Sequence, residues 1–107
     1  MIDAGLSQRE LTARLKFIGK APEDLSAIFL THEHSDHMRG VGPISRRYKL
    51  PLYSTDGTRY ASQDNVGNIK DWRRIGRSEK VMVGDMEIES YPTPHDAAES
   101  VAYVIRY

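Results

Sequence analysis

Three of the four histidines in this chain lie within six positions, in the stretch FLTHEHSDH at residues 29–37. His32, His34, Asp36 and His37 follow an apolar run in the order H-x-H-x-D-H. In an extended segment side chains alternate, so His32 and His34 project from one side and can hold one metal ion, with zinc–nitrogen bonds of about 2.0–2.1 Å. Asp36 and His37 leave the backbone in different directions and can serve a second ion about 3.5–4 Å away. The stretch therefore predicts a metal site rather than a polar surface turn.

Two residues outside the cluster, His95 and Asp3, belong to the same prediction. His95 stands alone in TPHDA between two predicted strands. A lone histidine is more often structural, but beside the cluster it is the predicted third imidazole for the first ion. Glu33 and Ser35 alternate with the ligands and are predicted to point away from the metal. Asp3 lies, like the cluster, where an apolar strand ends and a loop begins, which is where ligands tend to bind in open α/β sheets.

The elements before the cluster must place it at the end of a strand. Ser7 and Glu10 have the S-x-x-E spacing of a capping box, and apolar residues recur at helical spacing after them, so a helix is predicted over 8–18. One loose helical turn is predicted at 23–25 and a strand over 27–31. The continuous apolar run in that strand is typical of a strand buried on both faces.

The remaining chain contains a second unit and then a hairpin. Helices are predicted over 38–48 and 56–63, strands over 50–55, 79–83, 86–92 and 100–107, and a loop over 65–79. Gly40 and Gly42 weaken the first of these helices. This order predicts a single domain over residues 1–107, of class α/β (α+β), with helices packed on a mixed sheet.

Composition excludes several classes of protein. The 107 residues include 15 basic and 15 acidic side chains, so net charge favours no partner. The sequence has no cysteine, which excludes a disulfide framework, a thiolate zinc site and a cysteine nucleophile. No apolar stretch approaches a membrane span, and the first residues lack the pattern of a secretion signal. We expect a cytoplasmic protein with no membrane partner.

Positive charge is concentrated in the middle of the chain. Residues 39–80 carry ten Lys or Arg against four Asp or Glu. One interpretation is a solvated connecting segment. The other is an anionic substrate lying near the histidines, because basic surface attracts phosphates. The sequence leaves both interpretations open.

Three segments of the chain together resemble one known family. H-x-H-x-D-H after an apolar strand resembles the central motif of the metallo-β-lactamase superfamily of metal-dependent hydrolases. IDAG at residues 2–5 resembles the first motif of that superfamily, and TPHDA at 93–97 resembles the third. The sequence around the central motif, with Gly40 and the SRRY stretch, is most similar to the YycJ-like branch, which is regarded as exonuclease-like.

The resemblance implies a fold and a role for each residue of the predicted site. The fold would be a partial αββα sandwich. The implied ligands are His32, His34 and His95 for the first ion, and Asp36 and His37 for the second. Zn²⁺ is the expected metal, with Mn²⁺ or Fe²⁺ as alternatives. Metal-bound hydroxide would attack the scissile bond, and Asp36 would be the catalytic residue that orients it. Asp3 would buttress the metal-binding loop without touching the metal.

The resemblance also implies a class of substrate. The YycJ-like branch favours hydrolysis of phosphodiesters in single- or double-stranded DNA or RNA. One alternative is an acyl, lactone or thioester hydrolase of the same fold. A second alternative, from another class of protein, is a truncated, non-catalytic metal-binding module.

The chain departs from the family pattern in its length and its second metal site. It is expected to cover roughly the first half of the fold, as a fragment of a longer enzyme or as a truncated descendant. The family supplies a later bridging aspartate and a later histidine, whereas only Asp96 and Glu99 follow His95 here, too near the third motif to bridge. We therefore expect one tightly bound metal ion and an incomplete second site. Self-association is expected through the face that truncation leaves uncovered.

Overall fold

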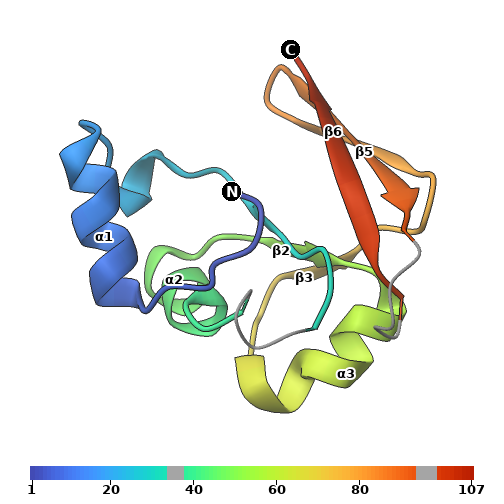
Figure 1. Ribbon diagram of the computed structural model, residues 1–107, viewed down its shortest axis with the longest axis horizontal. Coiled ribbons are helices and arrows are strands. Elements are labelled where there is room, and N and C mark those ends of the chain that lie inside the picture. The colour runs from blue at the N-terminus through green and yellow to red at the C-terminus, as the bar shows by residue number, and fades with distance from the viewer. Residues whose placement is uncertain (34–37, 94–98) are drawn as a thin grey trace.

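The computed structural model describes residues 1–33, 38–93 and 99–107. Its elements follow one another as helices, strands and short connections in the order shown in Figure 1. The helices are α1 (Gln8–Phe17), a 3-10 turn η1 (Pro22–Asp24), α2 (Val41–Tyr48) and α3 (Asp56–Val66). The strands are β1 (Ile28–Phe29), β2 (Leu52–Ser54), β3 (Trp72–Arg74), β4 (Lys80–Val83), β5 (Met86–Pro92) and β6 (Val101–Arg106).

The parallel and antiparallel strand pairs lie in two separate three-stranded sheets. The first sheet is parallel, with the order β1-β2-β3. Ile2 adds an isolated parallel bridge to Phe29 of the outer strand β1. The second sheet is antiparallel, with the order β4-β5-β6. The predicted α/β class is confirmed. The parallel and antiparallel strands that were expected in one mixed sheet lie in two sheets.

Most of the predicted elements are confirmed. Ser7 accepts a hydrogen bond from the backbone N–H of Glu10 and begins α1, as its spacing predicts. The hairpin at the end of the chain turns at Gly84, whose φ of 59° lies in the left-handed region that glycine adopts without strain. The predicted helix over 38–48 begins later, at Val41, and the helix predicted to end at residue 63 continues to Val66.

Strand β3 was not predicted. Trp72–Arg74 lies within the segment 65–79, which was predicted to be a loop. The strand has three residues, none of them fully buried, and it shows no hydrophobic alternation that the sequence could display. Its backbone bonds to β2, with Leu52 opposite Trp72, are what make it a strand.

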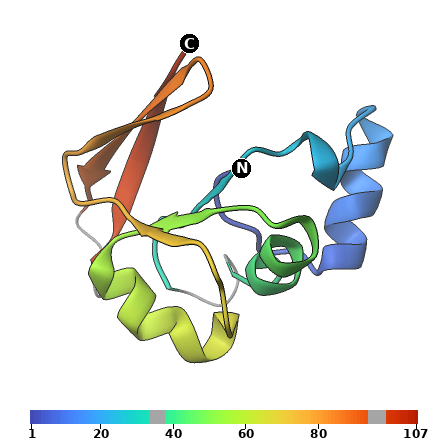
Figure 2. The same ribbon diagram turned by 180° about the vertical axis from the view of Figure 1, so that it is seen from behind.

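The short strand β1 is covered on both faces, as its continuous apolar sequence predicts. Ile28 and Leu30 pack with Val41 and Ile44 of α2 in one apolar cluster. Phe29 points the other way, into a second cluster that includes Tyr53, Ile75 and Ile88. Figures 1 and 2 show the consequence: α1 and α2 lie at one end of the molecule, the antiparallel sheet lies at the other, and β2 and β3 run between them.

The far end of the antiparallel sheet extends beyond this core. Ile105 on β6 is 50% exposed, although Ile88, its partner on β5, is 3% exposed. Met82 on β4 is also exposed. The expected self-association through an uncovered apolar face stays a prediction. In the part of the chain that the structure describes, the helices are too short or too polar to cross a membrane.

Candidate metal centre

The first motif is fastened to the end of β1 by its aspartate. Asp3 donates its backbone N–H to Phe29 O at 2.8 Å. Its carboxylate accepts the backbone N–H of Thr31 at 2.9 Å and the hydroxyl of the same residue at 2.8 Å. Asp3 has a φ of 56°, a left-handed conformation that aspartate tolerates better than most residues. Both carboxylate oxygens of Asp3 therefore hold the residue that immediately precedes the histidine cluster.

The hydroxyl of Thr31 continues this chain of hydrogen bonds to His32. Thr31 Oγ1 lies 2.7 Å from His32 Nδ1, and the His32 side chain is buried. A carboxylate oxygen only accepts, so the hydroxyl proton of Thr31 is directed at Asp3, and Thr31 Oγ1 accepts the proton on Nδ1. The contact thus assigns His32 the tautomer that carries its proton on Nδ1, which leaves a lone pair on Nε2.

The chain that follows the histidine cluster is also bound to the first motif. Gly40 donates its backbone N–H to Ala4 O at 2.7 Å. A Cβ built at Gly40 would overlap the carbonyl oxygen of Leu6, so only glycine fits. Since the φ of Gly40 is −96°, the requirement is one of space rather than of backbone conformation. The two ends of the cluster are therefore both anchored to residues 3–6.

Strand β6 reaches the same place from the other end of the chain. Val101 donates its backbone N–H to Thr31 O at 2.9 Å, and Tyr103 donates its hydroxyl to Leu30 O at 2.6 Å. Burial raises the pKa of Tyr103 far above its ordinary value, and the negative charge of Asp3 adds to the increase. The phenol therefore stays a neutral hydrogen-bond donor, and it fixes the backbone one residue before Thr31.

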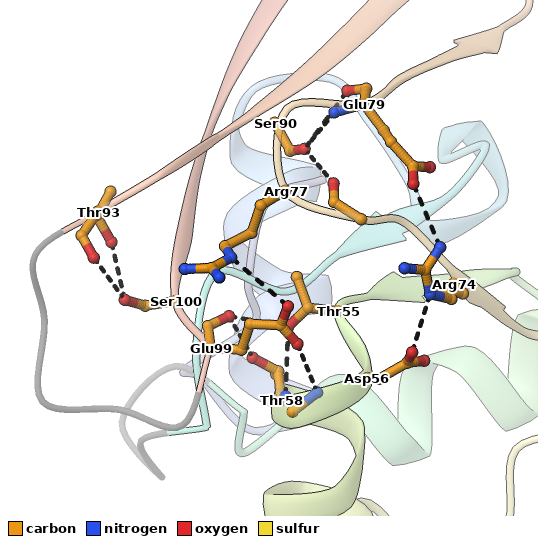
Figure 3. Close-up of polar contacts among 12 residues, drawn as sticks. Thr55, Asp56, Thr58, Arg74, Arg77, Glu79, Ser90, Thr93, Glu99 and Ser100 are labelled. Atoms are coloured by element: carbon orange, nitrogen blue, oxygen red, sulfur yellow. Dashed lines mark hydrogen bonds and ion pairs between the residues drawn. The ribbon is translucent and has the colours of Figure 1, made fainter.

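Thr93 and Ser100, which lie on either side of residues 94–99, are hydrogen-bonded to each other. Thr93 Oγ1 donates to Ser100 Oγ at 2.8 Å, and the backbone N–H of Thr93 donates to Ser100 O at 3.3 Å, as Figure 3 shows in part. Ser100 precedes Val101, which is bonded to Thr31. The first residue of the third motif, Thr93, is thus bonded to the residue next to Val101, which in turn bonds to the residue that precedes His32.

Glu99, the neighbour of Ser100, is hydrogen-bonded to the start of helix α3, whose N-cap is Thr55 (Figure 3). The hydroxyl of Thr55 donates to Glu99 O at 2.8 Å, and the backbone N–H of Gly57 donates to Glu99 Oε1, also at 2.8 Å. The other carboxylate oxygen of Glu99 lies 3.6 Å from Arg77 Nε. The Glu99 carboxylate is therefore engaged by a helix N-terminus and an arginine.

The structure places only part of the predicted site. His32 follows β1, and the carboxylate of Asp3 accepts two hydrogen bonds from Thr31, the residue before His32. Their service to a metal ion stays a prediction. The remaining predicted ligands lie outside the described residues: His34, Asp36, His37 and His95. In residues 1–33, 38–93 and 99–107, no three His, Asp or Glu side chains gather in a way that could hold a metal.

Sequence reasoning missed several residues that support the site. Thr31 precedes the cluster directly, and a hydroxyl beside a candidate ligand is a signal that could have been used. Tyr103 is separated from its partner Leu30 by 73 positions, and nothing in its sequence environment indicates the contact. Glu99 was considered only as a possible metal ligand, and its role at the start of α3 was not predicted.

The described part of the site fits a metal ion. Histidines that bind metals almost always donate their second ring N–H to an oxygen, which fixes the tautomer and the orientation of the ring. His32 has this arrangement through Thr31, with Asp3 behind the hydroxyl. The predicted donors are imidazoles and a carboxylate, which suit zinc and other transition metals.

Comparison with known proteins identifies the family. The sequence profile of the metallo-β-lactamase superfamily matches residues 1–106. The chain belongs to this superfamily. It is 38% identical over 109 aligned residues to the exodeoxyribonuclease WalJ of Streptococcus pneumoniae, and 39% identical over 105 to the exodeoxyribonuclease YycJ of Bacillus anthracis. Each alignment covers 96% of this chain, and the expected resemblance to the YycJ-like branch is confirmed.

The fold comparison agrees with the sequence comparison. A class B3 di-zinc metallo-β-lactamase, LRA-12 from an Alaskan soil metagenome, matches with a TM-score of 0.82 at 15% identity. That match covers 97% of this chain and 45% of the lactamase, so it establishes the fold alone. The chain spans 40% of the length of the two exodeoxyribonucleases.

Proposed function

We propose that this chain is the metal-binding part of a hydrolase that cleaves phosphodiester bonds in nucleic acid, in the manner of an exodeoxyribonuclease. The observation that carries the proposal is the 38–39% identity to two exodeoxyribonucleases across 96% of the chain. It favours a nucleic acid over the acyl, lactone or thioester substrates that the fold also accepts. The supported tautomer of His32 favours a metal-binding role for this residue, and only nucleotide release separates the hydrolase from the non-catalytic metal-binding alternative.

The proposed ligands of the first ion are His32, His34 and His95, and those of the second are Asp36 and His37. Zinc is the proposed metal, and manganese or iron are alternatives. A metal in this position would supply Lewis acidity, which would lower the pKa of water towards 7 and withdraw charge from a phosphoryl oxygen. Asp36 is proposed to orient the attacking water by accepting a hydrogen bond from it.

The described residues contribute positioning and the choice of proton site. Asp3 and Thr31 keep the proton of His32 on Nδ1, so that Nε2 would be the nitrogen that binds a metal ion. Tyr103 and Val101 hold the carbonyl groups of Leu30 and Thr31, so the backbone that carries His32 is fixed from β6. These bonds arrange the imidazole before a metal or a substrate arrives, which reduces the cost of ordering it on binding.

Activity on matched substrates tests the proposal. The zinc- or manganese-loaded chain should release nucleotides from single-stranded or nicked DNA and should leave thioester and lactone substrates intact. His34→Ala should abolish that release, and Lys16→Ala on the exposed face of α1 is the matched control. A chain that binds metal tightly but releases no nucleotide would support the non-catalytic alternative.

The number of bound metal ions tests the predicted ligand count. Three imidazoles and a water complete a four-coordinate zinc site, whereas Asp36 and His37 offer a second ion two groups and no bridge. Two cations about 4 Å apart repel each other, and a bridging carboxylate normally offsets part of that repulsion. Elemental analysis after dialysis should therefore give about one metal ion per chain. Two tightly held ions would show that Asp96, Glu99 or another chain completes the second site.

A further inference from the structure

A basic groove lies on the surface where α2 and α3 end. It has a volume of about 820 Å³, and its lining includes Arg46, Lys49, Asn68 and Lys70. A second hollow of about 380 Å³ adjoins it, because Asn68 and Ile69 line both. The lining of the second hollow also includes Arg59 and Trp72. We call the two together the basic groove.

The basic groove is remote from the predicted metal site. Lys49 and Asp71 precede β2 and β3, whereas His32 follows β1. The groove therefore lies where the parallel strands begin and the predicted metal site where they end, and we call these two ends the two edges of the parallel sheet. Helix α3 connects them: its N-terminus binds Glu99, and its last residue, Val66, accepts a hydrogen bond from Arg46. A helix of these 11 residues spans about 16 Å. A small substrate in the metal site could not reach the groove, but a polymer could.

Positive charge in the groove exceeds what the fold itself needs. Arg46 donates to Val66 O at 2.7 Å and to Asn68 O at 3.4 Å, and so neutralises the C-terminus of α3. Two helices end here, and each C-terminus carries about half a negative charge. Within the described residues, none of Arg46, Lys49 and Lys70 forms an ion pair with a carboxylate. Three cations against about one negative charge leave a positive surplus.

The carboxylates of the groove do not cancel this surplus. Asp71 receives two hydrogen bonds from Arg73, at 2.9 and 2.8 Å, and these bonds hold the pKa of Asp71 below its ordinary value. That carboxylate is therefore already matched by a cation outside the groove. Asp64 remains in the lining of the second hollow, which also contains Arg59.

The second hollow adds an aromatic platform to the charge. Trp72 donates its indole N–H to Ser54 Oγ at 2.7 Å, which fixes the plane of the ring. The guanidinium of Arg59 lies over that ring, 5.0 Å from its centroid. Bases of single strands stack on aromatic rings and on arginine guanidinium planes, while cations follow the phosphates. Stacking surfaces beside cations therefore favour a nucleic acid over a ligand that carries negative charge alone.

We propose that the basic groove binds a single strand of nucleic acid, with Lys49 and Lys70 on its phosphates and the Arg59–Trp72 pair against a base. The proposal rests on the proposed nuclease function, and it names where the substrate strand runs beyond the metal site. The strand would be held at a distance from the scissile bond, and the groove would contribute to affinity rather than to chemistry.

The single tryptophan of the chain makes the proposal measurable without catalysis. The chain is titrated with an oligothymidylate in the presence of a chelator, and both Trp72 fluorescence and the anisotropy of a labelled oligonucleotide are followed. The test variant is Lys49→Gln/Lys70→Gln. The control is Lys16→Gln/Lys20→Gln, which removes the same charge from exposed positions at the end of α1.

The proposal expects Trp72 fluorescence to change on binding and the test variant to bind severalfold more weakly than the control. The slope of log affinity against log salt should become less steep by about 0.7 for each lost phosphate contact. Equal affinity in the two variants, or an unchanged Trp72 signal, would contradict strand binding in the basic groove and would leave the nuclease proposal standing. Failure of the proposed function has a different signature, in which the parent chain binds the oligonucleotide but releases no nucleotide when metal is restored.

Discussion

The two edges of the parallel sheet are built in different ways. At the edge where β1 ends, His32 is 8% exposed, and hydrogen bonds join its neighbourhood to residues 3–6 and to β6. At the opposite edge, Lys49 and Lys70 are exposed, and their ammonium groups make no hydrogen bond within the described residues. The first edge fixes atoms in place, whereas the second presents charge.

This difference teaches what each edge can tolerate. A buried bond between distant segments is lost completely when one partner is changed, and the other partner is left without its hydrogen bond. Exposed cations act through the sum of their field, and each contributes little to folding. Substitutions at the first edge should therefore disturb folding and metal binding together, while those of the exposed lysines at the second should mainly change the attraction of anions.

The largest effect is expected from Gly40→Ala. The new Cβ would overlap the carbonyl oxygen of Leu6, a backbone atom that cannot rotate away. We expect the free energy of unfolding to fall by about 3 kcal/mol, as in severe overpacking, and tight metal binding to weaken. Thermal or chemical unfolding measures the change.

Gly19→Ala is the control for this variant. Gly19 has a φ of 76° and no neighbour within 4 Å of an added Cβ, so it reports the cost of the backbone conformation alone. That cost is about 1 kcal/mol. If Gly40→Ala proved no more destabilising than Gly19→Ala, the close approach of the two motifs would not be what holds this edge.

The second effect is expected from Thr31→Val, which removes a hydroxyl and keeps the shape of the side chain. Asp3 loses one donor, and His32 Nδ1 loses the oxygen that fixes its tautomer. Loss of such a supporting partner typically weakens metal binding 10- to 100-fold, so calorimetric titration with zinc should show a change of about that size. Thr12→Val is the matched control, because its hydroxyl bonds only to Gln8 O within α1. An equal affinity in both variants would show that Thr31 serves the fold alone.

Prediction from the sequence succeeded for the strand that leads to the first edge. The continuous run at β1 identified a strand buried on both faces, because a strand with apolar residues on both sides must be covered on both sides. That the metal site lies at the end of the same strand stays a prediction. The sequence also indicated Asp3 through its resemblance to the family, and the structure places its carboxylate on Thr31.

Other features could not be predicted because they depend on contacts between distant segments. Gly40 and Gly42 were interpreted as residues that weaken a helix, but a Cβ at either would overlap a backbone carbonyl, of Leu6 and of Val66 respectively. The hydrophobic pattern of a sequence does not show how closely two backbones approach. Strand β3 is defined by its pairing with β2. The role of Tyr103 depends on its hydrogen bond to Leu30, 73 positions away. In each case the partner, rather than the local sequence, determines the role.

A smaller effect is expected from Arg46→Gln, at the opposite edge. The guanidinium closes the C-terminus of α3 through Val66 O, on the surface rather than in the core. The loss of this bond should lower the free energy of unfolding by about 1 kcal/mol, and metal affinity should not change. Unfolding in urea measures the first quantity, and zinc titration measures the second. A loss of metal affinity would show that α3 transmits changes from one edge to the other through Glu99.

The smallest effect on folding is expected from Lys49→Gln/Lys70→Gln, the pair of changes that should weaken strand binding the most. Neither ammonium group makes an ion pair in the described part of the chain, and surface substitutions of this kind usually change the free energy of unfolding by less than about 0.5 kcal/mol. Lys49 has a left-handed φ of 54°, but glutamine meets the same backbone cost as lysine, so that cost cancels. Urea unfolding of the variant and its parent should therefore agree, while their affinities for an oligonucleotide differ. A marked loss of stability would mean that these lysines neutralise the two helix C-termini, and the charge at this edge would then belong to the fold rather than to a ligand.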